Sequence, residues 1–113
     1  AKEPLKPEID IDTFGKADLR VGIVLACEKV PNTSKLLKLQ IDLGTEQRQI
    51  VSGIAKYYKP EDMVGKHVIV VTNLKPATLC GVESYGMLLA ASDGNDNLQV
   101  IFADSMAAGS RVR

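Results

Sequence analysis

The chain has 113 residues, a length typical of one domain with a single hydrophobic core. Apolar residues make up 45% and aromatic residues 4%, which excludes a disordered protein and indicates a core of aliphatic side chains. The 14 basic and 14 acidic residues cancel, which excludes binding of nucleic acid by bulk positive charge alone. No apolar run approaches the ~20 residues that span a membrane and no signal peptide is visible, so we expect a soluble, cytoplasmic protein with no membrane contact.

The first eleven residues alternate charged side chains with proline and show no apolar period. Proline fixes φ and lacks a backbone donor, so residues 1–11 predict an extended linker. Such a linker indicates a domain taken from the end of a longer protein. Asp12 is then expected to cap a short helical turn over residues 13–17.

Three strands are predicted next. Residues 19–30 form the first, with Leu19, Val21, Ile23 and Leu25 on one side and a bend or a close backbone approach at Gly22. The second, residues 35–44, has the clearest alternation of the chain. Its inward residues are Leu37, Leu39, Ile41 and Leu43. Residues 48–53 form the third strand.

Short helical turns are expected over residues 53–66, followed by a strand at 67–74 that is covered on both faces, a strand at 87–92 and a strand-like segment at 97–103. Three strands, a helical connection and two more strands are the element order of a five-stranded Greek-key barrel, the OB-fold. The predicted class is therefore all-β, with extra strand-like segments at the C-terminus. A β-sandwich is the alternative.

The sequence offers few candidate catalytic residues. His67 is the only histidine and begins a predicted strand, and no nucleophile stands beside an evident base. Cys27 and Cys80 lack metal-ligand spacing and are expected to be reduced thiols. We expect no enzyme activity, cofactor or metal in this segment. A binding surface is better supported, because the outward groups near one open face could contact phosphates and sugars, although the lysines could also be a solvated strand face: Arg20, Lys35, Lys38, Ser52 and Asn73.

Five ordered motifs resemble a known family. They are DLRVG at 18–22, NTSKL at 32–36, VSGI at 51–54, NLKP at 73–76 and GxxSxGMLLA at 81–90. Together they resemble the tRNA-binding domain family, and most of all the C-terminal domain of bacterial methionyl-tRNA synthetase. The resemblance implies an OB-fold that binds the outer corner of tRNA without strong sequence preference and without a cofactor.

The resemblance also implies RNA-binding positions. The connection between Asn73 and Met87 would arch over the open face, with sharp turns at Gly81 and Gly86 and the hydroxyl of Ser84 in the groove. Ser84 could instead stabilise a turn, and Met87 could belong to the core. The complete set of predicted RNA-binding residues is Arg20, Lys35, Lys38, Ser52, Asn73, Lys75, Ser84 and Met87.

One departure from the family lies in this connection, where Thr78–Cys80 replaces a common basic pair. Two fewer cations predict a weak, non-catalytic binder that acts in cis with the catalytic region of a parent methionine–tRNA ligase, because tethering supplies effective concentration. The predicted organisation is a linker at 1–11, an OB-fold domain at 12–92 and a C-terminal extension at 93–113 that forms a homodimer interface. A chaperone-like member that binds peptides, favoured by Leu79, Val82 and Met87, and a module for dimerisation only are the alternatives.

Overall fold

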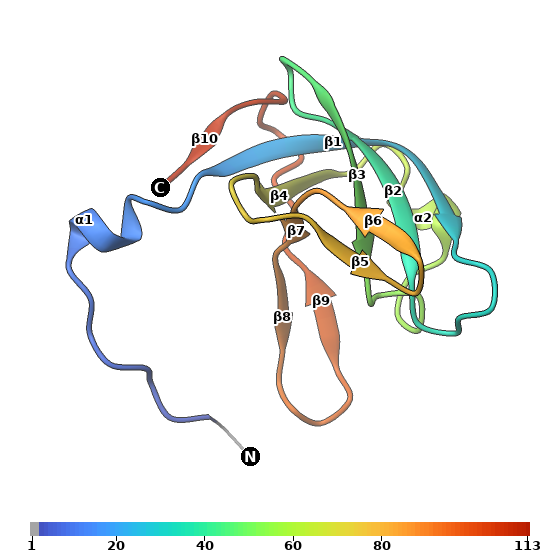
Figure 1. Ribbon diagram of the computed structural model, residues 1–113, viewed down its shortest axis with the longest axis horizontal. Helices are drawn as coiled ribbons and strands as arrows, with labels where there is room; N and C mark the ends of the chain where they lie inside the picture. Colours follow the sequence, from blue (N-terminus) through green and yellow to red (C-terminus); the bar gives the residue numbers. More distant parts are fainter. Residues whose placement is uncertain (1–2) are drawn as a thin grey trace.

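The computed structural model describes residues 3–113, and Figure 1 shows a curved sheet with an N-terminal segment that extends away from it. Ala1 and Lys2 of the predicted linker lie outside the described residues; residues 3–10 are exposed and carry no regular structure. The elements are α1 (Ile11–Phe14), β1 (Leu19–Lys29), β2 (Leu37–Asp42), β3 (Gln47–Ser52), α2 (Pro60–Met63), β4 (His67–Val71), β5 (Ala77–Leu79), β6 (Val82–Ser84), β7 (Met87–Leu88), β8 (Ala90–Ser92), β9 (Leu98–Val100) and β10 (Arg111–Val112).

The main sheet has the antiparallel order β3-β2-β1-β4-β7, and β10 pairs with the start of β1. The long strand β1 pairs with β4 over its first half and with β2 over its second half. A Cβ on Gly22 would lie 2.4 Å from Cγ2 of Ile41, so the backbone approaches β2 more closely than any side chain allows. This confirms the predicted close approach at Gly22 and an OB-like all-β fold.

The core forms where the alternating apolar side chains of β2 pack against those of the other strands. Leu37, Leu39 and Ile41 are fully buried and Leu43 nearly so, as predicted. In β4 the four consecutive residues from Val68 to Val71 are buried, which confirms a strand covered on both faces. The short helix α2 lies between β3 and β4 and contributes the fully buried Met63.

Two local predictions were wrong. Leu25 is 44% exposed and Val24 is buried instead, because a register shift between Val24 and Ala26 changes which side of β1 faces the core. Asp10 rather than Asp12 caps α1, with its carboxylate accepting a 2.8 Å hydrogen bond from the amide of Thr13. The cap stands two residues earlier because the helix itself begins at Ile11.

The C-terminal segment is part of the same core. Strands β8 and β9 form a hairpin across the predicted boundary at 92/93, and Val100 of β9 is fully buried. The predicted strand at 87–92 is divided into β7 and β8, since the chain leaves β4 at Leu89 and pairs with β9. Phe102 forms a bridge to Val68, whereas Ile101 is 40% exposed. Intrachain packing therefore covers most of the apolar side chains at 98–102, within the segment predicted to form a dimer interface.

Within residues 3–113, neither helix is long and apolar enough to cross a membrane.

Candidate nucleic-acid interface

The connection from β4 to β7, residues 73–86, forms a hairpin of its own that we call the arch. Strands β5 and β6 pair within it, and Cys80 and Gly81 make the turn with φ values of 49° and 80°. Two consecutive residues with positive φ are typical of the tight turn that matches strand twist. Residues 73–81 are all exposed. The arch is thus an ordered two-stranded ribbon that presents its first strand to solvent (Figure 1).

The returning half of the arch is attached to β3. The amide of Val51 donates to Oγ of Ser84 at 3.0 Å, and the amide of Tyr85 donates to the carbonyl of Gln49 at 2.9 Å. The Ser84 hydroxyl itself donates to the carbonyl of Gly86 at 3.0 Å and is 4% exposed as a residue. The expectation that this hydroxyl points into an open groove is therefore wrong, because both of its hydrogen-bonding roles are used to hold the arch.

A single guanidinium joins the two ends of the arch. From β3, Nη1 of Arg48 donates to the carbonyl of Thr72, just before the arch, and to the carbonyl of Tyr85 at 3.2 Å. Its Nε donates to Glu46 at 2.9 Å. Arg48 was not among the predicted binding residues. No local signal could have found this role, since the two carbonyls lie 24 and 37 residues further along the chain.

The first end of the arch is also fastened to the segment before β1. The side chain of Asn73 accepts from the amide of Asp18 at 2.8 Å and donates to the carbonyl of Lys16. The hydroxyl of Thr72 donates to the carboxylate of Asp18 at 2.6 Å, and this bond, ahead of the contacts with Arg20, lowers the pKa of Asp18. Asn73 is exposed, yet both the oxygen and the nitrogen of its carboxamide are already used in hydrogen bonds within the chain.

Three of the remaining predicted residues lie near the ends of strands. At the end of β4, Arg20 pairs with Val70 in register, and Met87, 48% exposed, pairs with Val71. Two residues before β2, Lys35 is exposed and its carbonyl accepts from the amide of Ala55.

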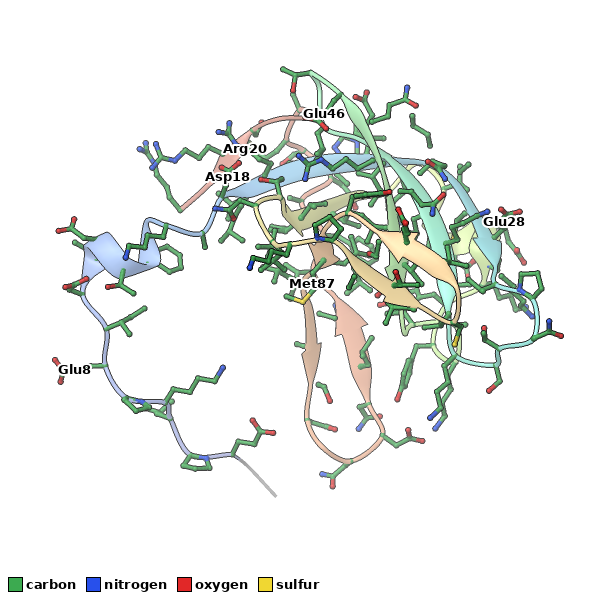
Figure 2. The ribbon with its side chains drawn as sticks, viewed as in Figure 1. Glu8, Asp18, Arg20, Glu28, Glu46 and Met87 are labelled. Atoms are coloured by element: carbon green, nitrogen blue, oxygen red, sulfur yellow. The ribbon has the colours of Figure 1, made fainter. Side chains whose placement is uncertain are left out.

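Two of the predicted cations have acidic partners. Arg20 forms a 2.9 Å ion pair with Asp18, and Lys38 forms a 2.7 Å ion pair with Glu28. Ser52 is partly exposed opposite Leu37, and Lys75 is exposed on the arch. Figure 2 shows Asp18, Arg20 and Glu46 at the same end of the barrel, with Met87 below the arch.

A cavity of about 540 Å³ lies between β3 and the arch, and we call it the arch cavity. Residues 46–49 of the β3 side form one wall, and Leu74, Pro76 and Tyr85 of the arch form the other. Thr72 completes the lining. Its two charged residues, Glu46 and Arg48, are paired with each other, so the cavity itself carries no excess of either charge.

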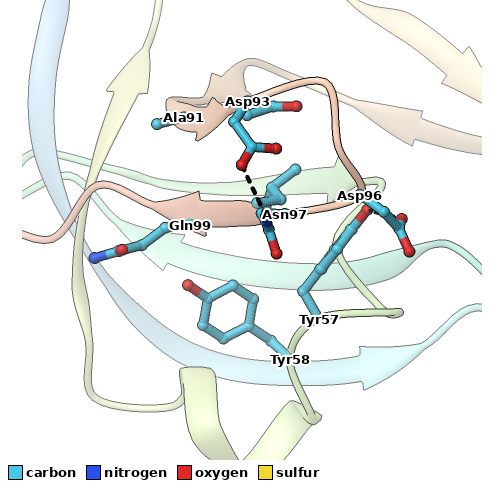
Figure 3. A pocket seen from close by; sticks show the side chains of 9 residues that line it. Tyr57, Tyr58, Ala91, Asp93, Asp96, Asn97 and Gln99 are labelled. Atoms are coloured by element: carbon cyan, nitrogen blue, oxygen red, sulfur yellow. Dashed lines mark hydrogen bonds between the residues drawn. The ribbon is translucent and has the colours of Figure 1, made fainter. Parts of the chain in front are cut away.

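A second cavity of about 650 Å³ lies between Tyr57, Tyr58 and the β8–β9 hairpin, and we call it the hairpin cavity (Figure 3). Two carboxylates, Asp93 and Asp96, line it. Nζ of Lys56 donates to both carboxylate oxygens of Asp96 at 2.6 and 2.7 Å, and these bonds, followed by one from the Tyr57 hydroxyl, lower the pKa of Asp96. Two carboxylates in the wall make this cavity unsuitable for a phosphodiester chain.

Metal-ligating and nucleophilic groups contribute little. Among residues 3–113, no group of three or more histidine, cysteine, aspartate or glutamate side chains is arranged to hold a metal ion. Both cysteines are free thiols, and burial raises the pKa of Cys27 to about 11, which makes it unreactive at neutral pH. His67 lies at the start of β4, as expected, with Nδ1 at 2.6 Å from the carbonyl of Met106.

The comparisons with known proteins agree with this geometry. The profile of the family described as a putative tRNA binding domain matches residues 19–111. The methionine–tRNA ligase of Methanocaldococcus jannaschii is 59% identical over 107 residues, which cover 94% of this chain and 16% of that protein. The methionine–tRNA ligase of Clostridium perfringens is 54% identical over 113 residues, 99% of this chain and 18% of that protein. The chain thus spans less than a fifth of the ligases that it matches.

Solved structures share the fold closely. A MetRS-related protein from Pyrococcus horikoshii superimposes with a TM-score of 0.92 at 41% identity, covering 96% of this chain and all of that one. The chaperone CsaA from Bacillus anthracis superimposes with a TM-score of 0.85 at 25% identity, covering 95% of this chain and all of that one. With a family profile over most of its length and relatives above 50% identity, the chain belongs to the tRNA-binding domain family and is the counterpart of the domain found in methionine–tRNA ligases.

Proposed function

We propose that this chain is a non-catalytic module that binds folded tRNA through its backbone and shape, in cis with the catalytic region of a cytoplasmic methionine–tRNA ligase. The observation that carries the proposal is the family match over residues 19–111, together with 59% identity to a methionine–tRNA ligase. Lys75 is exposed on the arch, which is fastened to the barrel at both ends, and Lys35 is exposed just before β2. A fixed arch supports binding because little conformational entropy is lost when the ligand docks.

The charges of the interface favour weak binding. Arg20 and Lys38 already have acidic partners, and the exposed hairpin tip carries Thr78, Leu79 and Cys80 instead of cations. Each phosphate contact contributes about one unit to the salt slope, so few free cations predict a shallow dependence of affinity on salt. A weak site suits a module whose effective concentration is set by attachment to an enzyme.

Titration of the chain with unfractionated tRNA at low and near-physiological salt tests this proposal, with an unstructured RNA of equal length as competitor. We expect binding that weakens modestly as salt rises and that prefers the folded tRNA. Lys35→Ala should weaken binding to several tRNA species about equally, because phosphate contacts carry no base information. The matched control is Lys66→Ala, which removes the same charge at the opposite end of β4 from the arch and should have a smaller effect. A loss with one tRNA species alone would contradict backbone recognition.

Peptide binding is a second candidate, supported by the likeness to the chaperone CsaA and by the exposure of apolar side chains on the arch and at the start of β7. Leu74 is 46% exposed, Leu79 37% and Met87 48%. The higher identity to methionine–tRNA ligases favours tRNA. Competition between tRNA and a permanently unfolded protein for the chain would decide between the two, since a preference for the unfolded protein would support the chaperone function.

We also propose that the chain forms a homodimer through its N-terminal segment and the end of its C-terminal segment. Leu5 is 98% exposed, Ile9 63% and Ile11 78%, which is more apolar surface than an isolated segment of this length normally presents. A cavity of about 410 Å³ beside α1, lined in part by Phe14 and Val112, offers a place for such side chains. Sedimentation velocity over a concentration series measures the state of assembly, and a monomer at every concentration would refute a dimer.

A further inference from the structure

The arch cavity has two unlike walls. Leu74 and Pro76 give one wall an apolar surface, to which Tyr85 adds an aromatic ring that is 38% exposed. The facing wall, from β3, carries the polar side chains of Gln47, Arg48 and Gln49. The volume of about 540 Å³ falls within the range of sites that hold small organic groups. An aromatic plane opposite hydrogen-bonding groups is the arrangement that recognises planar heterocycles.

The aromatic ring is held in place before a ligand binds. The amide of Tyr85 donates to the carbonyl of Gln49 at 2.9 Å, and its carbonyl accepts from Arg48 at 3.2 Å. Its hydroxyl donates to the carboxylate of Glu83. With backbone and hydroxyl both fixed, the ring has few conformations to lose, so a group that stacks on it gains nearly the full stacking energy.

The polar wall keeps hydrogen-bonding capacity for a ligand. Arg48 uses Nε and Nη1 for its bonds within residues 3–113, which leaves the two N–H groups of Nη2. Gln47 is exposed and its carboxamide can donate and accept. Gln49 is committed, because it donates to the carbonyl of Glu83 at 2.8 Å and accepts from Gln40 at 3.2 Å. Gln47 and Arg48 can therefore meet the edge of a base, while Gln49 stabilises the wall.

We propose that the arch cavity is a subsite for one unstacked nucleobase of the bound RNA, which stacks on Tyr85 and presents its edge to Gln47 and Arg48. The inference rests on the proposed tRNA-binding function and deepens it, since it adds one contact to a base to contacts with the backbone. Folded RNA offers such bases in its loops and bulges. An apolar peptide side chain could pack against the aromatic wall, but it would fit the cavity as a whole less well, because it would leave the polar wall without hydrogen-bonding partners.

The chain contains no tryptophan, so a single substitution makes a specific reporter. In Tyr85→Trp, stacking of a base on the indole should quench its fluorescence when unfractionated tRNA is added. Tyr57→Trp is the matched control, since Tyr57 is a partly exposed tyrosine that lines the hairpin cavity instead. We expect saturable quenching at position 85 and little change at position 57, with filter binding of the same tRNA measured in parallel.

The outcomes separate this inference from the function on which it rests. Absence of tRNA binding to the unsubstituted chain would overturn both proposals. Binding of tRNA without quenching at position 85, or with equal quenching at positions 85 and 57, would overturn the subsite alone. Quenching at position 85 by a polyanion without bases, such as heparin, or by an unfolded protein in place of tRNA, would also overturn it.

Affinity measurements provide a second readout that needs no reporter. Tyr85→Leu keeps much of the side-chain volume but removes the ring, and we expect it to weaken tRNA binding about 5- to 100-fold, the usual range for loss of one stacked base. Tyr85→Phe should bind nearly as well as the unsubstituted chain, because it keeps the ring. An equal loss in both variants would assign the effect to the hydroxyl bond with Glu83 and overturn stacking.

Discussion

The two tyrosine-lined cavities are built by the same means and differ in charge. In each, a hairpin is fastened to the barrel by a cation, Arg48 for the arch and Lys56 for β8–β9. Arg48 bonds to two backbone carbonyls, whereas Lys56 bonds to the carboxylate of Asp96. Both cations also pair with a carboxylate, Arg48 with Glu46 and Lys56 with Asp96, so the charges of each pair cancel. The hairpin cavity keeps the further negative charge of Asp93, whereas the arch cavity has no excess of either charge, so the arch cavity suits a polyanion better than the hairpin cavity does.

The two cations also differ in how much of their side chains is exposed. Arg48 is partly buried, with 26% of its side chain exposed, and it joins segments that are 37 residues apart. The ion pair of Lys56 and Asp96 is more exposed, at 59% and 65%. Exposed ion pairs contribute little to stability because water screens them. We therefore expect the arch to depend strongly on its cation and the β8–β9 hairpin to depend mainly on its buried strand residue Val100.

The largest expected effect comes from removing the two cations separately. Arg48→Ala should lower the free energy of unfolding by about 2–3 kcal/mol, because the carbonyls of Thr72 and Tyr85 lose a charged donor. Lys56→Ala should change it much less. Urea unfolding of both variants checks the difference. Arg48→Lys should recover only part of the loss, since an ammonium lacks the fork that reaches both carbonyls. Equal effects in the two alanine variants would contradict the comparison.

Glycines before and after β6, Gly81 and Gly86, allow the stability of the arch to be tested by substitution inside it. Gly86 has φ +149°, and a Cβ there would lie 3.1 Å from the carbonyl oxygen of Val71 and 3.2 Å from Cδ1 of Ile50. Gly86→Ala should therefore cost about 1–3 kcal/mol of stability. Gly81, with φ +80°, has no atom near an added Cβ, so Gly81→Ala should cost only the backbone strain of about 1 kcal/mol.

Thermal unfolding of the two glycine variants measures this difference directly. The Gly86 variant should also bind tRNA less well if the arch shapes the proposed site, whereas the Gly81 variant changes only the exposed hairpin tip. A Gly81 variant less stable than the Gly86 variant would mean that the turn, rather than the contact with β3 and β4, limits the arch.

The sequence predicted the parts of the fold that depend on local pattern. The alternation of Leu37, Leu39 and Ile41 defined β2, and the need for positive φ marked the turns at Gly81 and Gly86. The prediction failed where contacts between distant segments determine the environment of a side chain. The burial of Ser84 follows from a bond to Val51, 33 residues away.

The candidate site was predicted less well than the fold for the same reason. Motif resemblance selected Asn73 and Ser84, whose polar atoms are used within the chain, and it passed over Arg48 and Tyr85, which shape the arch cavity. A resemblance identifies residues that matter at a site, but it does not distinguish a residue that touches a ligand from one that holds the site together. Whether the predicted residues bind RNA stays a prediction.

The smallest expected effect concerns pH, which should act differently on the contacts of Lys56 and of Arg48. Hydrogen bonds from Lys56 and then Tyr57 lower the pKa of Asp96 in the folded chain. A lowered folded pKa means that its stabilising contribution is complete above the ordinary aspartate value of about 3.9 and is lost as pH falls through the folded value. The two carbonyl acceptors of Arg48 carry no ionisable group.

Comparison of Asp96→Asn with the unsubstituted chain from pH 7 to pH 3 checks this sign. The unsubstituted chain should have the higher urea midpoint at pH 7, and the difference should begin to shrink as pH falls below about 3.9, because protonated Asp96 resembles asparagine. The difference between Arg48→Ala and the unsubstituted chain should persist over the same interval, because the bonds to the carbonyls of Thr72 and Tyr85 are lost at every pH. A pH-independent effect of Asp96→Asn would show that the hairpin is held by hydrogen bonding of Asp96 rather than by its charge, and the contrast between the two cavities would then rest on geometry alone.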